Sequence, residues 1–333
     1  MAQHLGLSEW TVSRAINGHP EVKAATRERI LKAMDELGFR PNPVARKLSG
    51  KQMGIVGVCV VNAHSRVIID KIRFLDKFLK QHGIRAILSL ASREKERELK
   101  TIRDFLHLRV DGVVLFQSTL DVPSLNKTLG NVSCVLVDPE ASFAPRVWLD
   151  RGEAMRLIVQ HLFELGHRSF GLLGISPIDK FRWAGLIKAF ADYGVNFEKS
   201  VQVFGIEKGM GDSYSDGVLL ARRAVAAKKR ATAYIALNDE IAIGSLPIFR
   251  EAGLRAPEDF SIVGFDNLPA GMYLQPSLTT IDQQVDLMIT SAGELLLEEL
   301  GLKEKTDSSR CVKIPPKIII RGSTGPAPRR TKK

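Results

Sequence analysis

Residues 5–17 have the sequence LGLSEWTVSRAIN, which predicts the end of a short helix, a turn at Gly6 and a second helix. Ser8 suits the N-cap of the second helix, because its hydroxyl can accept a hydrogen bond from a free backbone N–H. Three apolar residues have the i, i+3, i+4 spacing that buries one helix face: Val12, Ala15 and Ile16. The pattern is typical of a helix-turn-helix, whose second helix contacts DNA, and the alternative is an ordinary amphipathic helix of a bundle.

The outward face of this second helix holds the candidate DNA contacts. We expect Arg14, with Glu9 and Trp10, to reach base edges in the major groove. The remaining polar residues are expected mainly to fix the helix on the phosphates: Ser8, Thr11, Ser13 and Asn17.

A third helix is predicted at residues 26–37, where Ile30, Leu31, Met34 and Leu37 recur at helical spacing before Gly38. It would close a helix-turn-helix domain over residues 1–41, and a unit of about forty residues is a small one. Only Met1 to Leu5 precede the turn, so we expect a shortened first helix and a true translation start upstream of Met1.

Residues 42–53 predict a hinge helix and linker, because two prolines set off the short run Val44-Ala45-Arg46-Lys47-Leu48. An exposed Leu48 between basic residues fits poorly into a core. It suits an apolar wedge pressed between base pairs from the minor groove, with Arg46 and Lys47 on the flanking phosphates. Asn42 and Ala45 belong to the same candidate DNA-binding segment.

These segments resemble the lactose-repressor/galactose-repressor family of bacterial transcription regulators. The resemblance rests on the sequences at 11–18 (TVSRAING), 38–42 (GFRPN) and 45–51 (ARKLSGK). It implies a sequence-specific repressor that binds a pseudo-palindromic operator as a homodimer. It also implies allosteric control of operator affinity by a small molecule, a sugar or a sugar derivative. Relatives carry several more residues before the position of Met1.

Charge and composition agree with a DNA-binding protein of several domains. The 333 residues are 44% hydrophobic and carry a net charge of +11, which suggests an anionic partner. Residues 310–333 hold eight basic and no acidic residues. We therefore expect a basic, disordered tail at 322–333.

Targeting and metal-binding signals are missing from the sequence. The three cysteines lack CxxC spacing and the seven histidines lack HxxxH spacing, so we expect no disulfide, metal or cofactor. The longest apolar runs are strand-sized and no apolar leader is seen, which favours a cytoplasmic protein.

From residue 54 onward the chain alternates predicted strands with predicted helices, which indicates an α/β fold with parallel sheets covered by helices. The family resemblance implies a two-lobed core at 54–321, like a type I periplasmic binding protein. The first lobe would comprise 54–150 and 282–308, and the second 151–281 and 309–321. The chain would cross between the lobes near Asp150, Asp282 and Ser309.

Ligands of open α/β sheets lie at the carboxyl ends of the strands, so the residues there are candidate effector contacts. Asn62 and Ser65 follow the first predicted strand, Phe116 ends the third and Asp138 follows the fourth. The resemblance adds second-lobe motifs at 182–185, 238–239, 263–266 and 279–283. It implies that five residues line the effector cleft: Asp138, Arg182, Asn238, Asp266 and Gln283. This set suits a polyol, with Phe116 or Trp183 covering an apolar sugar face.

Each candidate has a purely structural explanation as well. Asp138 and Asp266 could cap turns, Asp239 more readily than Asn238 could cap the next helix, and Arg182 could pair with a neighbouring carboxylate. An enzyme is disfavoured, because Gly209-x-Gly211 is only a weak echo of a dinucleotide loop. Two further classes of protein share part of the pattern, an exported sugar-binding protein and a constitutive DNA-bending protein. We expect the assembly to stop at a dimer, because no apolar heptad pattern follows Ile320.

Overall fold

The computed structural model describes residues 2–16, 19–38, 52–61, 65–139, 145–206, 213–306 and 310–328. The chain divides between Met53 and Gly54 into two compact units, called the head and the core from here on.

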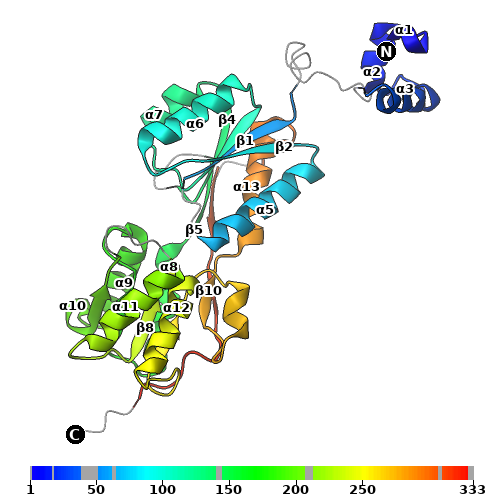
Figure 1. The fold of residues 1–333 in the computed structure, drawn as a ribbon. Coiled ribbons are helices and arrows are strands. Elements are labelled where there is room, and N and C mark those ends of the chain that lie inside the picture. Colours follow the sequence, from blue (N-terminus) through cyan, green and yellow to red (C-terminus); the bar gives the residue numbers. More distant parts are fainter. Residues whose placement is uncertain are drawn as a thin grey trace. The chain divides into compact units, whose positions relative to one another are not determined.

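The head contains three helices around a small apolar centre, α1 (Ala2–Leu5), α2 (Glu9–Ile16) and α3 (Ala24–Glu36) (Figure 1). Ser8 caps α2 as predicted, because its Oγ accepts a hydrogen bond from the Thr11 backbone N–H at 3.0 Å. Five side chains fill the centre: Leu5, Val12, Ala15, Ile30 and Ala33. The small Ala33, rather than Leu31, completes the buried face of α3, since Leu31 is 47% exposed.

The first lobe of the core is a six-stranded sheet in the order β11-β5-β4-β3-β1-β2, in which every neighbouring pair is parallel. Its strands are β1 (Ile55–Val60), β2 (Arg85–Leu90), β3 (Gly112–Phe116), β4 (Ser133–Val137), β5 (Arg146–Leu149) and β11 (Cys311–Ile314). Helices α5 (Arg66–Gln81) and α13 (Val285–Glu299) pack together, as do α6 (Lys95–His107) and α7 (Val122–Leu129) (Figure 1).

The second lobe is a four-stranded parallel sheet in the order β7-β6-β8-β9. Its strands are β6 (Phe170–Leu173), β7 (Val201–Phe204), β8 (Ala233–Ala236) and β9 (Ser261–Val263). Helix α8 (Arg151–Glu164) packs on α9 (Lys180–Asp192), and α11 (Tyr214–Ala226) packs on α12 (Asp239–Glu251). Short elements complete the lobe: α10 (Phe197–Ser200) and the 3₁₀ helix η1 (Pro269–Tyr273).

Two antiparallel strands, β10 (Thr280–Asp282) and β12 (Lys317–Ile319), form a separate ribbon. Because β11 pairs with β5 in the first sheet, the assignment of 309–321 to the second lobe is wrong for residues 311–314. The last crossing therefore follows Ile314 rather than Ser309.

The expectation of a disordered tail from residue 322 is also wrong for residues 322–328. The backbone N–H groups of Gly325 and Ala327 donate to Ser261 Oγ at 3.0 Å and to the Leu165 carbonyl at 2.8 Å. Ser323 is fully buried. These contacts fix the segment against the second lobe despite its composition, and residues 329–333 lie outside the described part of the chain.

Candidate functional site

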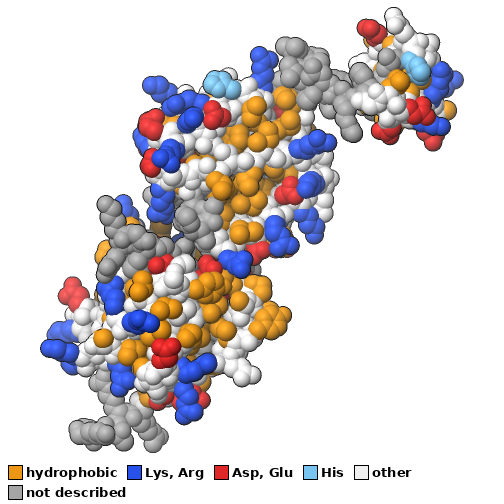
Figure 2. Space-filling view, in the orientation of Figure 1, with side chains coloured by type: hydrophobic (Ala, Val, Ile, Leu, Met, Phe, Trp, Pro, Cys, Tyr) orange, Lys and Arg blue, Asp and Glu red, His pale blue; other side chains and the backbone are white. Residues whose placement is uncertain are grey.

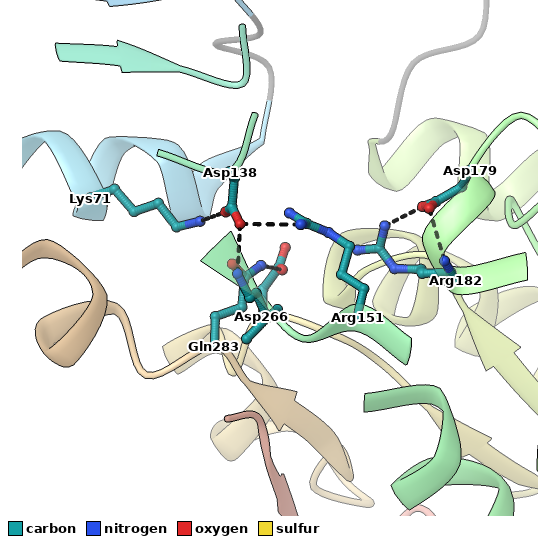
Figure 3. A network of polar contacts seen from close by, with 8 residues as sticks. Lys71, Asp138, Arg151, Asp179, Arg182, Asp266 and Gln283 are labelled. Atoms are coloured by element: carbon teal, nitrogen blue, oxygen red, sulfur yellow. Dashed lines mark hydrogen bonds and ion pairs between the residues drawn. The ribbon is translucent and has the colours of Figure 1, made fainter. Parts of the chain in front are cut away.

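A buried polar network gathers side chains from both lobes of the core (Figure 3). At its centre is Asp138, which directly follows β4 and has a φ of 52°. Its Oδ2 accepts a hydrogen bond from Lys71 Nζ on α5 at 2.7 Å. Its Oδ1 accepts from the Leu149 N–H at 2.9 Å and from Arg151 Nη1, at the start of α8, at 3.1 Å.

Asp138 is therefore occupied by protein donors. Burial alone would raise its pKa, but Arg151 and Lys71 outweigh burial and hold the pKa below the ordinary range. The resemblance implied that Asp138 lines the effector cleft. In the structure it accepts hydrogen bonds from two cationic side chains, Lys71 and Arg151, and neither was among the predicted site residues.

On the side of the second lobe, Asp179 and Arg182 form an ion pair at the start of α9. Asp179 also accepts a hydrogen bond from the Arg182 backbone N–H at 3.2 Å, so it is the N-cap of this helix. The Arg182 guanidinium lies over the Phe265 ring, 4.3 Å from its centroid. The structural alternative for Arg182, pairing with a neighbouring carboxylate, is thus confirmed. Its Nε is buried and has no hydrogen-bond partner among the described residues.

Asp266 and Gln283 complete the network from the loop after β9 and the residue after β10. The Gln283 amide donates to Asp266 Oδ1 (Figure 3), and Gln283 Oε1 is buried with no partner in the described part of the chain. Gln117 directly follows β3, and its Oε1 is likewise buried without a partner among the residues that the structure describes. Arg151 lies within electrostatic reach of Asp179 and Asp266, so it links the two sides.

The other predicted effector residues have different positions. Asn238 is the N-cap of α12, because its Oδ1 accepts from the Ile241 N–H at 2.9 Å, so the preference for Asp239 as the cap is wrong. Ser65 is buried at the N-cap of α5 without a side-chain capping bond. Phe116 is fully buried in the main hydrophobic cluster. It therefore exposes no ring face to a sugar, and the expectation of an aromatic cover at this residue is wrong. Asn62 lies outside the described residues.

The head presents the predicted recognition side chains on α2. Trp10 is 65% exposed, and the Arg14 guanidinium lies 4.0 Å from the centroid of its ring. Arg14 also forms an ion pair with Glu21, while Thr11 Oγ1 lies 2.8 Å from Ser8 Oγ. Five further predicted DNA contacts fall outside the described residues: Asn17, Asn42, Ala45, Arg46 and Leu48.

Apolar side chains also lie exposed on α5 and on β2, the edge strand of the first sheet. Ile69, Phe74, Leu88 and Leu90 are all more than one third exposed. Hydrophobic side chains gather on the face of the core that Figure 2 presents. In the described part of the chain, no helix has the length and apolar character to cross a membrane.

A helix-turn-helix head joined to a core of two parallel sheets defines the class of DNA-binding regulators with a binding-protein-like core. The family models agree: "Bacterial regulatory proteins, lacI family" matches residues 1–42, and "Periplasmic binding protein-like domain" matches residues 159–324. The head therefore matches the LacI family of regulators, and much of the core matches a binding-protein-like domain.

Several relatives match over nearly the whole chain. Catabolite control protein A of Priestia megaterium is 28% identical over 97% of this chain and 98% of its own. The HTH-type transcriptional repressor PurR of Vibrio parahaemolyticus is 28% identical over 97% of both chains. A Lac repressor dimer, solved bound to operator and the anti-inducer ONPF, is 26% identical over 97% of both chains, with a TM-score of 0.82.

The chain is accordingly a transcriptional repressor of the LacI family. Since this family is not enzymatic, the prediction that the protein is no enzyme is confirmed.

Proposed function

We propose that this repressor binds a neutral sugar or related polyol at the polar network, and that binding changes its affinity for a pseudo-palindromic operator. The observation that carries the proposal is the balance of charges in the network. Lys71, Arg151 and Arg182 face three carboxylates, those of Asp138, Asp179 and Asp266. A charged ligand would leave one buried charge without a partner, which is costly, whereas a neutral ligand preserves the balance.

The unpaired polar atoms indicate which chemical groups the ligand carries. Gln117 Oε1 and Gln283 Oε1 are acceptors, and Arg182 Nε carries a donor hydrogen. A buried polar atom without a partner costs about 1–3 kcal/mol. A hydroxyl group both donates and accepts a hydrogen bond, so a polyol can satisfy all three atoms.

The network also provides a route for coupling. Lys71 and Asp138 belong to the first lobe, whereas Arg151, Arg182 and Asp266 belong to the second. An effector that touches both groups favours one arrangement of the lobes over another. Allosteric coupling of this kind typically amounts to about 1–3 kcal/mol.

Operator binding uses the head. Arg14, Glu9 and Trp10 would contact base edges, and the segment with Asn42, Ala45, Arg46 and Leu48 would enter the minor groove. Two copies would pair through the exposed apolar side chains of α5 and β2 and place two recognition helices on one operator. The Lac repressor supports this arrangement, since it was solved as a dimer bound to operator.

A ligand panel and two site variants test the proposal. Neutral sugars, sugar acids, sugar phosphates and nucleobases would be screened by thermal shift. Operator affinity, for a duplex selected from a random library, would then be measured by fluorescence anisotropy with and without the hits. We expect neutral sugars to bind, and Arg182→Ala and Asp266→Ala to abolish the ligand's effect with operator binding nearly intact.

Arg156→Ala is the matched control, because Arg156 pairs with Glu153 on the outer surface of α8. It should respond like the natural protein. Binding of only charged ligands, or an unchanged ligand response in both site variants, would contradict the proposal.

A further inference from the structure

The loop that carries Asp266 has a backbone conformation that needs external support. Asp266 and Asn267 have φ values of 115° and 54°, in the region that residues other than glycine adopt rarely. Such residues persist only where surrounding contacts hold them. The contacts that hold this loop therefore determine where the Asp266 carboxylate points.

Several hydrogen bonds hold the loop from outside the effector network, among them the bond from the Asp266 N–H to the Ile281 carbonyl at 2.9 Å. The Leu268 N–H donates to Asp239 Oδ2 at 2.7 Å, and the Asn267 N–H donates to Thr280 Oγ1 at 3.2 Å. Arg321 Nη2 donates to Asn267 Oδ1 at 2.6 Å. The loop is thus held by the start of α12, by β10 and by the residue two positions after β12.

The supporting groups also bind one another or the neighbouring backbone. The Thr280 hydroxyl donates to Asp239 Oδ1 at 2.6 Å, and Arg321 Nη1 donates to the Leu278 carbonyl at 2.8 Å. Asp239 is fully buried. Gly264 allows the Asp239 carboxylate to lie this close to the loop backbone, because a Cβ at position 264 would lie 2.1 Å from Asp239 Oδ1.

We infer that Asp239 and Arg321 are positioning residues for the effector site: they set the orientation of Asp266 without touching the ligand. The role in effector binding rests on the proposed function, whereas the support of the loop does not. Arg321 lies two residues after β12, so the inference makes the segment that follows this strand a component of the sensing site.

Hydrogen exchange tests the support of the loop without any ligand. In Arg321→Ala, exchange in a peptide covering residues 264–270 should become about tenfold faster, because one of the loop's tethers is lost. Arg321→Lys keeps a cationic donor group at this position and should give an intermediate exchange rate. The surface variant Arg156→Ala should leave the rate unchanged. Equal rates in all four proteins would overturn the inference.

Effector affinity tests the positioning role, with the neutral sugar that gives the largest thermal shift in the natural protein as the probe. In Arg321→Ala its affinity should fall about tenfold, while operator affinity without sugar stays within about twofold. If no sugar binds the natural protein, the proposed function fails while the exchange experiment still decides on the loop. A normal sugar affinity in a variant with a loosened loop would overturn the positioning role.

The pH dependence of sugar affinity distinguishes a positioning role of Asp239 from a merely structural role. Burial and the neighbouring Asp266 raise the pKa of Asp239 to about 8, and its other facing groups are Thr280, the Leu268 N–H and Arg321. Raising the pH through about 8 therefore places a new negative charge beside Asp266. The natural protein should show a step in sugar affinity near this pH, and Asp239→Asn should not. The same step in both proteins would overturn the assignment of Asp239.

Discussion

Lys71 is a lysine with a 1% exposed side chain on an amphipathic helix, and its ammonium is held by Asp138. A buried charge that loses its partner is strongly destabilising. We expect Lys71→Ala to lower the free energy of unfolding by about 3 kcal/mol, measured by urea denaturation. Lys77→Ala is the control, because Lys77 is exposed on the same helix. Equal stabilities of the two variants would show that the ion pair between Lys71 and Asp138 contributes nothing to the free energy of unfolding.

The burial of Lys71 also shows why part of the site could not be predicted from the sequence. Lysines on an amphipathic helix are ordinarily solvated. Lys71 is buried because Asp138 and Arg151, distant in sequence, approach it in the fold. By contrast, strand ends and family motifs identify candidate site positions in the sequence. They allowed four site residues to be predicted: Asp138, Arg182, Asp266 and Gln283. The hydrogen-bond partners of those residues are a property of the folded chain.

Arg14 carries the prediction for DNA recognition. Its guanidinium stacks on the exposed Trp10 and is suited to a bidentate contact with guanine. We expect Arg14→Ala to weaken binding to a selected operator by about 1–3 kcal/mol and to relax specificity at one base pair. The exposed Lys32 of α3, changed to Ala, is the control. Equal loss of affinity for operator and for random duplex in anisotropy titrations would contradict base reading.

At the scale of elements, the alternation of strands and helices followed the sequence pattern closely. Strands β2, β6 and β7 belong to the predicted alternation after residue 54, because apolar residues predominate in each of them. The prediction missed β5, whose four residues include Arg146 and Trp148, and β11, which joins the sheet beside it. These two strands pair with each other across more than 150 residues of sequence, and local patterns do not reveal such a partner.

The contact between α11 and α12 gives a prediction at this scale. A Cβ on Gly244 would lie 2.0 Å from the Tyr214 carbonyl oxygen, and one on Gly217 would lie 2.3 Å from that of Ile241. The backbone of a packed helix cannot move aside as easily as the end of a flexible side chain. We therefore expect Gly244→Ala to cost about 1–3 kcal/mol or more, although alanine favours helices by about 1 kcal/mol.

Gly205→Ala is the control for this contact, because a Cβ there would have no atom of the described residues within 4 Å. Chemical denaturation of both variants compares them. If Gly244→Ala were as stable as the natural protein, α11 and α12 would not be packed backbone to backbone.

At the scale of the whole molecule, the exposed apolar face decides the assembly. Ile69 on α5 is 49% exposed, and Leu88 and Leu90 on β2 are 48% and 62% exposed. Since β2 is an edge strand, both its side chains and its free backbone edge are open to a partner. In the proposed dimer, a second copy of the chain would cover this face and would supply the second recognition helix that a pseudo-palindromic operator needs.

Sedimentation at micromolar concentration should accordingly give a mass close to twice 36.8 kDa. Ile69→Lys places a charge within the apolar face, so we expect it to yield monomers. Operator binding should then weaken, because a monomer has a single head and contacts only one half-site at a time. Leu108→Lys is the matched control, since Leu108 is 53% exposed at the end of α6 rather than on α5 or β2. A natural protein that sediments as a monomer or a stable tetramer, or a dimer that survives Ile69→Lys unchanged, would place the interface elsewhere.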